Sequence, residues 1–249
     1  MNVDMQQSLY GEGKENNMIK IENEEVLGWE HTIRGMRNPM NSWDKSDSKV
    51  VNENCEDCMH KADYSVCKHN SIHNCFNYEV GDNDLDLMKR LRNAGTDHRK
   101  YLRMITVYLD ITAPLYWWKE YDTYKVGTVA NSCSTMHKIH SKELTLDDFS
   151  CEHLEAHNIK LLEQIIDALN TERYNFNFGK QKSQWWQMIQ LLPSSYNQKR
   201  TVMLNYEVLA NMYKSRKNHK LDEWREFCKW IEQLPYSELI TGEFENENN

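Results

Sequence analysis

The chain has 249 residues, of which 39% are hydrophobic and 27% charged, and its formal net charge is −8. A chain of this length can bury a sizeable core, and it lacks any run of about eighteen apolar residues that would form a transmembrane helix. This net negative charge argues against a general nucleic-acid binder, although it says little about the charge of a single cleft.

The counts of cysteine, glycine and proline narrow the class of protein further. Seven cysteines without a recognisable secretion signal favour reduced thiols and a cytoplasmic location. Nine glycines and four prolines are too few for a turn-rich all-β protein, so helices should dominate. No GxGxxG or GxxxxGK[ST] motif occurs, so neither a Rossmann nor a P-loop phosphate site is predicted.

Both ends of the chain are polar. Residues 1–17 are expected to form a disordered leader and residues 241–249 a disordered tail, which leaves a single domain over 18–240. At the start of this domain, "MIKIE" (18–22) predicts a strand and "EVLGWEHTIRGM" (25–36) a helix.

Residues 48–80 form a polar insertion with little periodicity, which is typical of a long loop. Its candidate metal ligands are Cys55, Cys58, Cys67, Cys75, His60, His69 and His73. Thiolates and imidazoles at such spacings can close a tetrahedral zinc site, but a second CxxC pair is missing. A zinc site and a solvated loop with incidental thiols both stay open, and the second is favoured.

The segments that follow the insertion have clear periodicity. "NDLDLMKRLRNAG" (83–95) predicts a helix that Asn83 or Asp84 caps and Gly95 ends. Residues 105–111 alternate between apolar and polar side chains, which is the period of a half-buried strand.

The rest of the chain is predicted to be mainly helical. Pro114 suits a first helical turn, and the helix that it begins should end near Gly127. Further helices are expected over 159–169, 185–192, 200–216 and 221–234. The predicted fold is therefore α+β, with a small mixed or antiparallel sheet, several packed helices and a helix-rich C-terminal half.

The stretch "PLYWWKEYDTYKVGTVANSCSTMH" (114–137) combines aromatic, charged and hydroxyl side chains. A purely structural interpretation buries Trp117 and Trp118 and leaves the polar residues on a wet surface. A functional interpretation uses Asn131 and the hydroxyls to hydrogen-bond a polar ligand. Lys119 and Lys125 would then neutralise its phosphate, while an aromatic ring stacks on a base. Composition does not decide between the two.

This stretch resembles the active-site segment of the flavin-dependent thymidylate synthases (the ThyX family), approximately "aP-L-F-V-x-R-[QE]-W-x-R-H-R" followed by "xxSxNExSxRY". "APLYWWKEYDTYK" lies along the first part without a gap. Lys119, Glu120 and Tyr121 take the first arginine, the Gln/Glu position and the aromatic position. With one inserted residue, Asn131 and Ser134 take the Asn and the second Ser.

Two further segments extend the resemblance over roughly residues 80–235. "GTDHRKYLRMITVYLDITAP" is similar to the family's "GHxSxxEHxxFTFxxxAP", with His98 at the first histidine. "LNYEVLANMYKSRKNHKLDEWREF" is similar to "N-R-L-x-x-F-x-x-x-R...A-Q-x-E-I-R". Its matching residues are Asn205, Arg216, Glu223 and Arg225.

The resemblance implies a homo-oligomer, a tetramer, that binds FAD and a pyrimidine nucleotide such as dUMP at subunit interfaces. In the family reaction, reduced flavin supplies hydride and methylenetetrahydrofolate supplies a one-carbon unit to C5 of dUMP. The implied nucleotide-binding residues are Lys119, Glu120, Tyr121, Tyr124, Lys125, Asn131, Ser132, Ser134 and Arg216. The implied cofactor-binding residues are His98, Asn205 and Arg225, and no catalytic residue is assigned.

The chain also departs from the family pattern. Thr123, Tyr124 and Lys125 stand where the family has Arg-His-Arg, and lysine cannot bind phosphate bidentately as arginine does. The stretch looks like a distinct ThyX-like branch of the kind found in bacteriophages and their Firmicute hosts. The departures leave a second hypothesis open, which is a non-catalytic phage regulatory or anti-host factor that binds a nucleotide or a protein on the same fold.

Overall fold

The computed structural model describes residues 18–50 and 78–242. The predicted leader, most of the predicted insertion and the tail from residue 243 lie outside the described residues. None of the described helices combines the length and the hydropathy that a membrane crossing requires.

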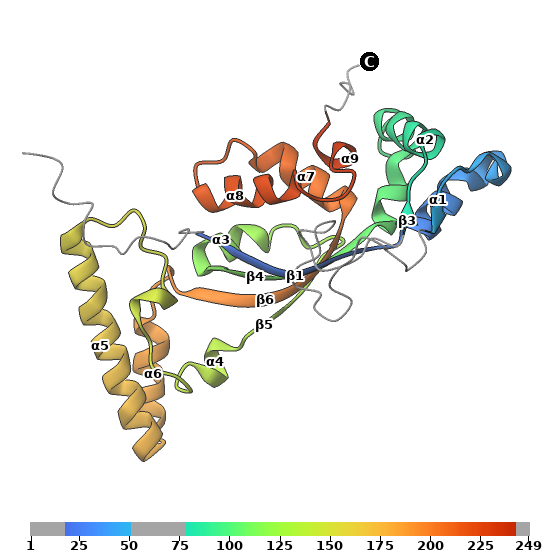
Figure 1. Cartoon of the computed structure of the whole chain (residues 1–249). Helices are drawn as coiled ribbons and strands as arrows, with labels where there is room; N and C mark the ends of the chain where they lie inside the picture. Colours follow the sequence, from blue (N-terminus) through green and yellow to red (C-terminus); the bar gives the residue numbers. More distant parts are fainter. Residues whose placement is uncertain (1–17, 51–77, 243–249) are drawn as a thin grey trace, which may run out of the picture.

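A four-stranded antiparallel sheet in the order β1-β4-β6-β5 forms the centre of the fold. Its strands are β1 (Lys20–Leu27), β4 (Thr106–Pro114), β5 (Val129–Ser132) and β6 (Asn197–Asn205). The helices α3 (Leu115–Tyr121), α7 (Tyr206–Arg216) and α8 (Asp222–Ile231) lie over one face of this sheet (Figure 1). The predicted α+β class with a small antiparallel sheet is confirmed.

The main core lies between the sheet and these helices. Val107, Leu109 and Ile111 of β4 are buried, and the polar residues between them face the other way, which confirms the strand predicted from alternation. Trp117 of α3 and Trp224 of α8 pack against each other on the helix side of the core, with ring centroids 4.8 Å apart. Burial of rings of this size is a large source of stability for the fold.

The first strand is longer than predicted, and the first helix is shorter. Residues 25–27 pair with β4, and α1 begins only at Trp29 (Trp29–Arg37). Gly28 separates the two elements with a φ of +96°, and a Cβ there would lie 2.2 Å from the carbonyl oxygen of Met104. The pairing partner, about 80 residues away in the sequence, overrides the local helical pattern.

The helix predicted over 200–216 is wrong in its first part, because residues 200–205 belong to β6. Polar side chains on the helix-covered face of β6 have partners inside the protein. The guanidinium carbon of Arg200 lies 4.2 Å from the ring centroid of Trp118, and its Nη1 lies 2.8 Å from Asp122 Oδ1. These partners let a polar sequence form an inner strand, which its periodicity does not predict.

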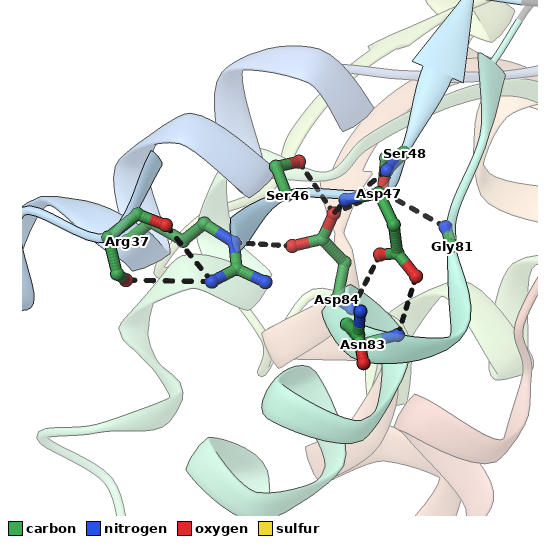
Figure 2. A network of polar contacts seen from close by, with 8 residues as sticks. Arg37, Ser46, Asp47, Ser48, Gly81, Asn83 and Asp84 are labelled. Atoms are coloured by element: carbon green, nitrogen blue, oxygen red, sulfur yellow. Dashed lines mark hydrogen bonds and ion pairs between the residues drawn. The ribbon is translucent and has the colours of Figure 1, made fainter. Parts of the chain in front are cut away.

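The helix α2 (Asp82–Asn93) is confirmed, but its N-terminal cap comes from a distant residue. Asp47 accepts hydrogen bonds from the backbone N–H of Asn83 at 2.9 Å and of Asp84 at 3.1 Å (Figure 2). The prediction that Asn83 or Asp84 caps this helix is therefore wrong. The capping carboxylate is supplied by the segment before the insertion, which no local pattern indicates.

The carboxylate of Asp84 is fully buried beside this cap. Its Oδ1 accepts from Arg37 Nε at 2.6 Å, and its Oδ2 accepts from Ser46 Oγ at 2.7 Å and from the backbone N–H of Ser48 at 3.1 Å (Figure 2). Both charges of the Arg37–Asp84 pair are almost completely withdrawn from water. Together they join α1, α2 and the segment between them.

The two ends of the predicted insertion are strands rather than loop. β2 (Lys49–Val50) pairs antiparallel with β3 (Tyr78–Glu79). β2 begins directly after Ser48, which donates to Asp84. The candidate zinc ligands between residues 55 and 75 lie outside the described residues.

A helical hairpin projects from one end of the sheet (Figure 1). It consists of α5 (Ala156–Gly179) and α6 (Lys182–Leu191), which confirms the helices predicted over 159–169 and 185–192. Leu162, Ile166 and Leu169 pack with Met188 in a second, smaller core.

Several short elements complete the described chain. They are η2 (Asn38–Met40), η3 (Trp43–Lys45), η5 (Arg99–Met104), α4 (Thr135–Lys138), η6 (Leu146–Asp148) and α9 (Glu238–Thr241). The last of them extends one residue into the predicted tail. The helix after Pro114 ends at Tyr121, earlier than the predicted end near Gly127.

We expect Asp84→Asn to lower the free energy of unfolding by about 3 kcal/mol near neutral pH, because Arg37 would stay buried without its counter-charge. Burial raises the pKa of Asp84, but hydrogen bonds from Ser48, Ser46 and Arg37 outweigh it, and the pKa lies below its ordinary value. This contribution is present above the ordinary carboxyl pKa of about 3.9 and is lost as the pH falls through the folded-state pKa. Urea unfolding of both proteins over acidic and neutral pH measures it.

Asp86→Asn is the matched control. Asp86 lies on the same helix in an exposed pair with Arg90 at 3.0 Å, and its loss should change the free energy of unfolding by less than about 0.5 kcal/mol. Equal decreases in the free energy of unfolding for the two variants would contradict the role assigned to Asp84.

Candidate functional site

The aromatic residues of α3 point into the core. Trp117 and Trp118 are fully buried, and Tyr121 is only 2% exposed, with its ring centroid 5.3 Å from that of Trp117. Burial raises the pKa of the Tyr121 hydroxyl above its ordinary value. Because its ring is enclosed by core residues, Tyr121 cannot stack on a ligand in this structure, and we remove it from the predicted nucleotide-binding set.

Glu120, in the same helix, collects donors at the point where α3, α7 and α8 meet. Its Oε2 accepts from Arg216 Nη1 at 2.5 Å and from Trp224 Nε1 at 3.1 Å. His219 Nε2 lies 3.3 Å from the same oxygen. The backbone N–H of Leu221 donates to His219 Nδ1 at 3.2 Å, so the proton of the neutral ring is on the nitrogen that faces Glu120.

These contacts hold the guanidinium group of Arg216 in one orientation. Its Nε donates to the hydroxyl of Tyr124 at 2.9 Å. Its central carbon lies 4.7 Å from the ring centroid of Trp224 and 5.5 Å from that of Tyr124, within the range of cation–π attraction. Three of the predicted site residues, Glu120, Tyr124 and Arg216, are thus in direct contact. We call them, with His219 and Trp224, the Arg216 cluster.

The loop after α3 runs alongside α7. Tyr124 meets Arg216 near the C-terminal end of this helix, and the carbonyl of Gly127 accepts from Asn205 Nδ2 at its N-terminal end, at 3.5 Å. The φ of Gly127 is +80°, and a Cβ there would lie 3.0 Å from Val208 Cγ2, so the close approach requires glycine. The loop therefore spans the helix, which at 11 residues is about 16 Å long.

Two of the predicted cofactor residues lie at the N-terminal end of α7. Asn205 caps the helix, and its Oδ1 accepts from the backbone N–H of Val208 at 3.1 Å. His98 is exposed directly before Arg99, whose Nε lies 3.1 Å from Glu207 Oε1 in the first turn of α7. The structure brings His98 and Asn205 to the same end of the sheet.

Arg225, the third predicted cofactor residue, lies at the opposite end. Its Nη1 donates to the carbonyl of His219 at 2.7 Å, and its Nη2 pairs with Asp222. Arg225 therefore supports the turn between α7 and α8 beside the Arg216 cluster, apart from His98 and Asn205.

Asn131, Ser132 and Ser134 follow the loop onto the edge of the sheet. Asn131 and Ser132 are exposed in β5, and Ser134 caps α4 by accepting from the backbone N–H of His137 at 3.2 Å. Ser132 pairs in the ladder with Arg200, which also binds Asp122. This pairing places the edge strand beside the end of α3.

The two predicted lysines are exposed, and each is the sequence neighbour of a member of the Arg216 cluster. Lys119 precedes Glu120, and Lys125 follows Tyr124. Neither lysine forms an ion pair within residues 18–50 and 78–242. Both cations are therefore available to an anionic ligand.

A cleft of about 440 Å³ opens elsewhere and contains none of the predicted site residues. Its lysines are each paired with a carboxylate: Lys199 with Asp110 and Glu22, Lys20 with Glu22, and Lys142 with Asp148. With its positive charges compensated internally, this cleft is a poor anion site. Among the residues with coordinates, no group of three or more His, Cys, Asp or Glu side chains is arranged for a metal ion.

Comparison with solved structures identifies the fold. A crystal structure of the flavin-dependent thymidylate synthase ThyX from Helicobacter pylori, complexed with FAD and dUMP, superposes with a TM-score of 0.60 over 91% of this chain and 98% of that chain. The chain has the ThyX fold. A second ThyX structure from the same organism, with FAD and dUMP at 2.31 Å resolution, gives a TM-score of 0.59 over 91% of this chain and 97% of the other.

The likeness is one of structure, because sequence identity to both ThyX structures is 16%. No protein-family model and no curated protein matches the sequence. The ThyX resemblance predicted from the active-site stretch is thus supported by the fold of the whole domain.

Sequence reasoning missed two members of the Arg216 cluster, His219 and Trp224. The basic segment "KSRKNHK" (214–220) was the available signal, because it places His219 among cations directly after Arg216. Trp224 gave no such signal, since a tryptophan on the apolar face of a helix is normally a core residue.

We expect a double-mutant cycle of Glu120→Gln and Arg216→Gln to give a coupling free energy of about 1 kcal/mol, since the pair is short but partly exposed. Urea unfolding followed by tryptophan fluorescence measures it. The matched cycle on the exposed pair Asp86 and Arg90 should give about 0.3 kcal/mol. A coupling near zero for Glu120 and Arg216 would show that the cluster does not orient the arginine.

Proposed function

We propose that the chain is a divergent member of the ThyX fold that binds a pyrimidine nucleotide, dUMP or a close relative, beside the Arg216 cluster, together with a flavin. The observation that carries the proposal is the orientation of Arg216 by Glu120 and Tyr124 on a fold whose solved neighbours hold FAD and dUMP. An arginine fixed by a carboxylate and two rings is a preorganised anion site.

The donors present suit a nucleotide phosphate. Arg216 uses Nε and Nη1 for internal bonds, and no acceptor within the described residues is bonded to its Nη2. That amino group, with Lys119 and Lys125, would bind the phosphate. Asn131, Ser132 and Ser134, on and after the neighbouring edge strand, would hydrogen-bond the ribose or the base.

Two of the residues that we propose for a flavin, His98 and Asn205, lie at the other end of the loop. His98 is exposed there, and Asn205 holds Gly127, so a cofactor at this end would lie against the same loop that borders the nucleotide. Bound reduced flavin would supply hydride for C5 methylation of the nucleotide by one-carbon transfer. The chain's own residues bind and orient the two ligands.

A specific observation favours a second candidate function, nucleotide binding without turnover. Thr123 and Tyr124 provide no guanidinium group, and the guanidinium of Arg216 is shared with Glu120. A regulatory phage factor that sequesters a nucleotide or blocks a host protein would need the phosphate site but not the hydride transfer. The cytoplasmic location expected from the sequence stays a prediction for both candidates.

The sheet face opposite the helices supports the proposed homotetramer. Tyr108 and Val129 lie on this face in one row, each opposite Met203, and are 42% and 59% exposed. Leu27 extends the same apolar area on β1. An apolar area of this kind on a sheet marks a protein–protein contact, and a second copy of the chain is the partner that the fold suggests.

We expect the double variant Tyr108→Ser/Val129→Ser to shift the protein from a tetramer of 29.8 kDa chains to smaller species, because it makes the shared face polar. Light scattering after size-exclusion chromatography measures the mass. Val126→Ser, at an exposed loop position, is the control and should leave the assembly unchanged. A wild-type monomer would contradict the proposal.

We expect the purified protein to show flavin absorbance, or to gain it on addition of FAD, and to bind dUMP in isothermal titration calorimetry. Lys125→Ala should weaken dUMP binding by about tenfold through loss of a phosphate contact. The control Lys160→Ala, on exposed helix α5, should bind dUMP normally.

Turnover separates the two candidate functions. Formation of dTMP from dUMP with reduced flavin and methylenetetrahydrofolate supports the enzyme, and dUMP binding without product supports the binding factor. A colourless protein that binds neither added FAD nor dUMP would rule out both.

A further inference from the structure

Cationic residues lie on five segments that belong to the Arg216 cluster or adjoin it. They are Lys119 of α3, Lys125 of the following loop, Arg216 at the end of α7, Lys220 of the next turn and Arg225 of α8. Contacts of Arg216 with Glu120 and Tyr124, and of Arg225 with the carbonyls of His219 and Lys220, hold these segments together. We call these five residues the basic face.

The basic face carries a clear excess of positive charge. Two carboxylates oppose its five cations, Glu120 beside Arg216 and Asp222 beside Arg225, which leaves an excess of three charges. The neighbouring Asp122 is already paired with Arg200. In a chain with a net charge of −8, such a local excess is unusual and must be offset by solvent ions or by a ligand.

Helix stabilisation accounts for only part of this charge. A cation at the C-terminal end of α7 interacts favourably with the helix dipole, and this accounts for the position of Arg216. Lys119 lies in the last turn of the short helix α3 and benefits from its dipole in the same way, but Lys125 and Lys220 lie outside any helix. All three lysines are exposed and form no ion pair within the described ranges. Each of them is the sequence neighbour of a residue in the Arg216 cluster, namely Glu120, Tyr124 and His219. The donors therefore come from three different segments around an arginine whose Nη2 has no bonded acceptor among the described residues, which is more than a single phosphate requires.

We propose that the basic face selects a nucleotide that carries a phosphate chain, a di- or triphosphate, over the corresponding monophosphate. A monophosphate brings about two negative charges near neutral pH and would leave the positive excess incompletely neutralised. A triphosphate brings about four and is long enough to meet Arg216 and the flanking lysines together. This inference rests on the proposed nucleotide site, and it names a ligand class that the monophosphate in the solved neighbours does not represent.

The test is isothermal titration calorimetry of the full chain with dUMP, dUTP, inorganic triphosphate and a short single-stranded oligonucleotide, without divalent cations. We expect dUTP to bind at least about tenfold more tightly than dUMP, and its affinity to fall more steeply with salt. The double variant Lys125→Ala/Lys220→Ala should remove the advantage of dUTP, while dUMP should lose only the affinity, about tenfold, expected from Lys125→Ala alone. Both lysines are exposed, so folding should be unchanged, and circular dichroism checks this.

Lys160→Ala serves again as the control, because it removes one exposed cation from α5, which contributes no residue to the basic face. It should keep the full preference for dUTP. If Lys160→Ala lost as much of the preference for dUTP over dUMP as the double variant does, the inference would be overturned. The preference would then reflect the net charge of the chain alone.

The remaining outcomes distinguish this inference from the proposed function. Equal affinities for dUMP and dUTP would overturn the phosphate-chain preference and leave the pyrimidine-nucleotide proposal intact. Tight binding of inorganic triphosphate with no contribution from the nucleoside would support the phosphate-chain site and contradict the pyrimidine proposal. An oligonucleotide that binds more tightly than dUTP would overturn the inference in favour of a nucleic-acid surface.

Discussion

The antiparallel pairing of β4 with β6 is the constraint on which the rest of this structure depends. The ladder joins Thr106 to Asn205 and Pro114 to Asn197 in one continuous register, between segments about 90 residues apart in the sequence. Because α3 follows directly after β4 and α7 directly after β6, the ladder also sets where these two helices meet. The contact of Glu120 with Arg216 follows from this placement. A shift of register would separate the carboxylate from the guanidinium group and turn the core residues of β4 outward.

Buried and half-buried arginines recur in this fold, and each is neutralised locally. Arg37 pairs with Asp84, Arg200 stacks on Trp118 and pairs with Asp122, and Arg216 pairs with Glu120 between two rings. Desolvating a guanidinium group is costly, and these partners offset the cost with charge-assisted hydrogen bonds and ring contacts. Around Arg216, the exposed lysines Lys119 and Lys125 of neighbouring segments add positive charge, and neither forms an ion pair with a described carboxylate.

The stretch from Pro114 to His137 divides into core residues and surface residues, a division that its composition left undecided. The rings of Trp117, Trp118 and Tyr121 face the core, which accounts for its aromatic content. Glu120 and Tyr124 point sideways to Arg216, and Lys119 and Lys125 face solvent. The structural interpretation therefore holds for the three rings, and the residues proposed to bind a ligand lie elsewhere on the same short helix and its loop. This division follows from helical geometry, since neighbouring residues point in directions about 100° apart.

Patterns in the sequence predicted the α+β class, the strand over 105–111, the helices α2, α5 and α6, and the resemblance that the ThyX fold supports. These features rest on periodicity and motifs within short windows, where local preference and tertiary environment agree. Other features emerge only in the folded chain: residues 197–205 form a strand, Asp47 caps α2, Tyr121 is a core residue, and His219 and Trp224 join Arg216 at Glu120. Each of these depends on a partner far away in the sequence. A polar strand or a distant cap is stabilised by contacts that exist only once the chain has folded, so no local pattern contains them.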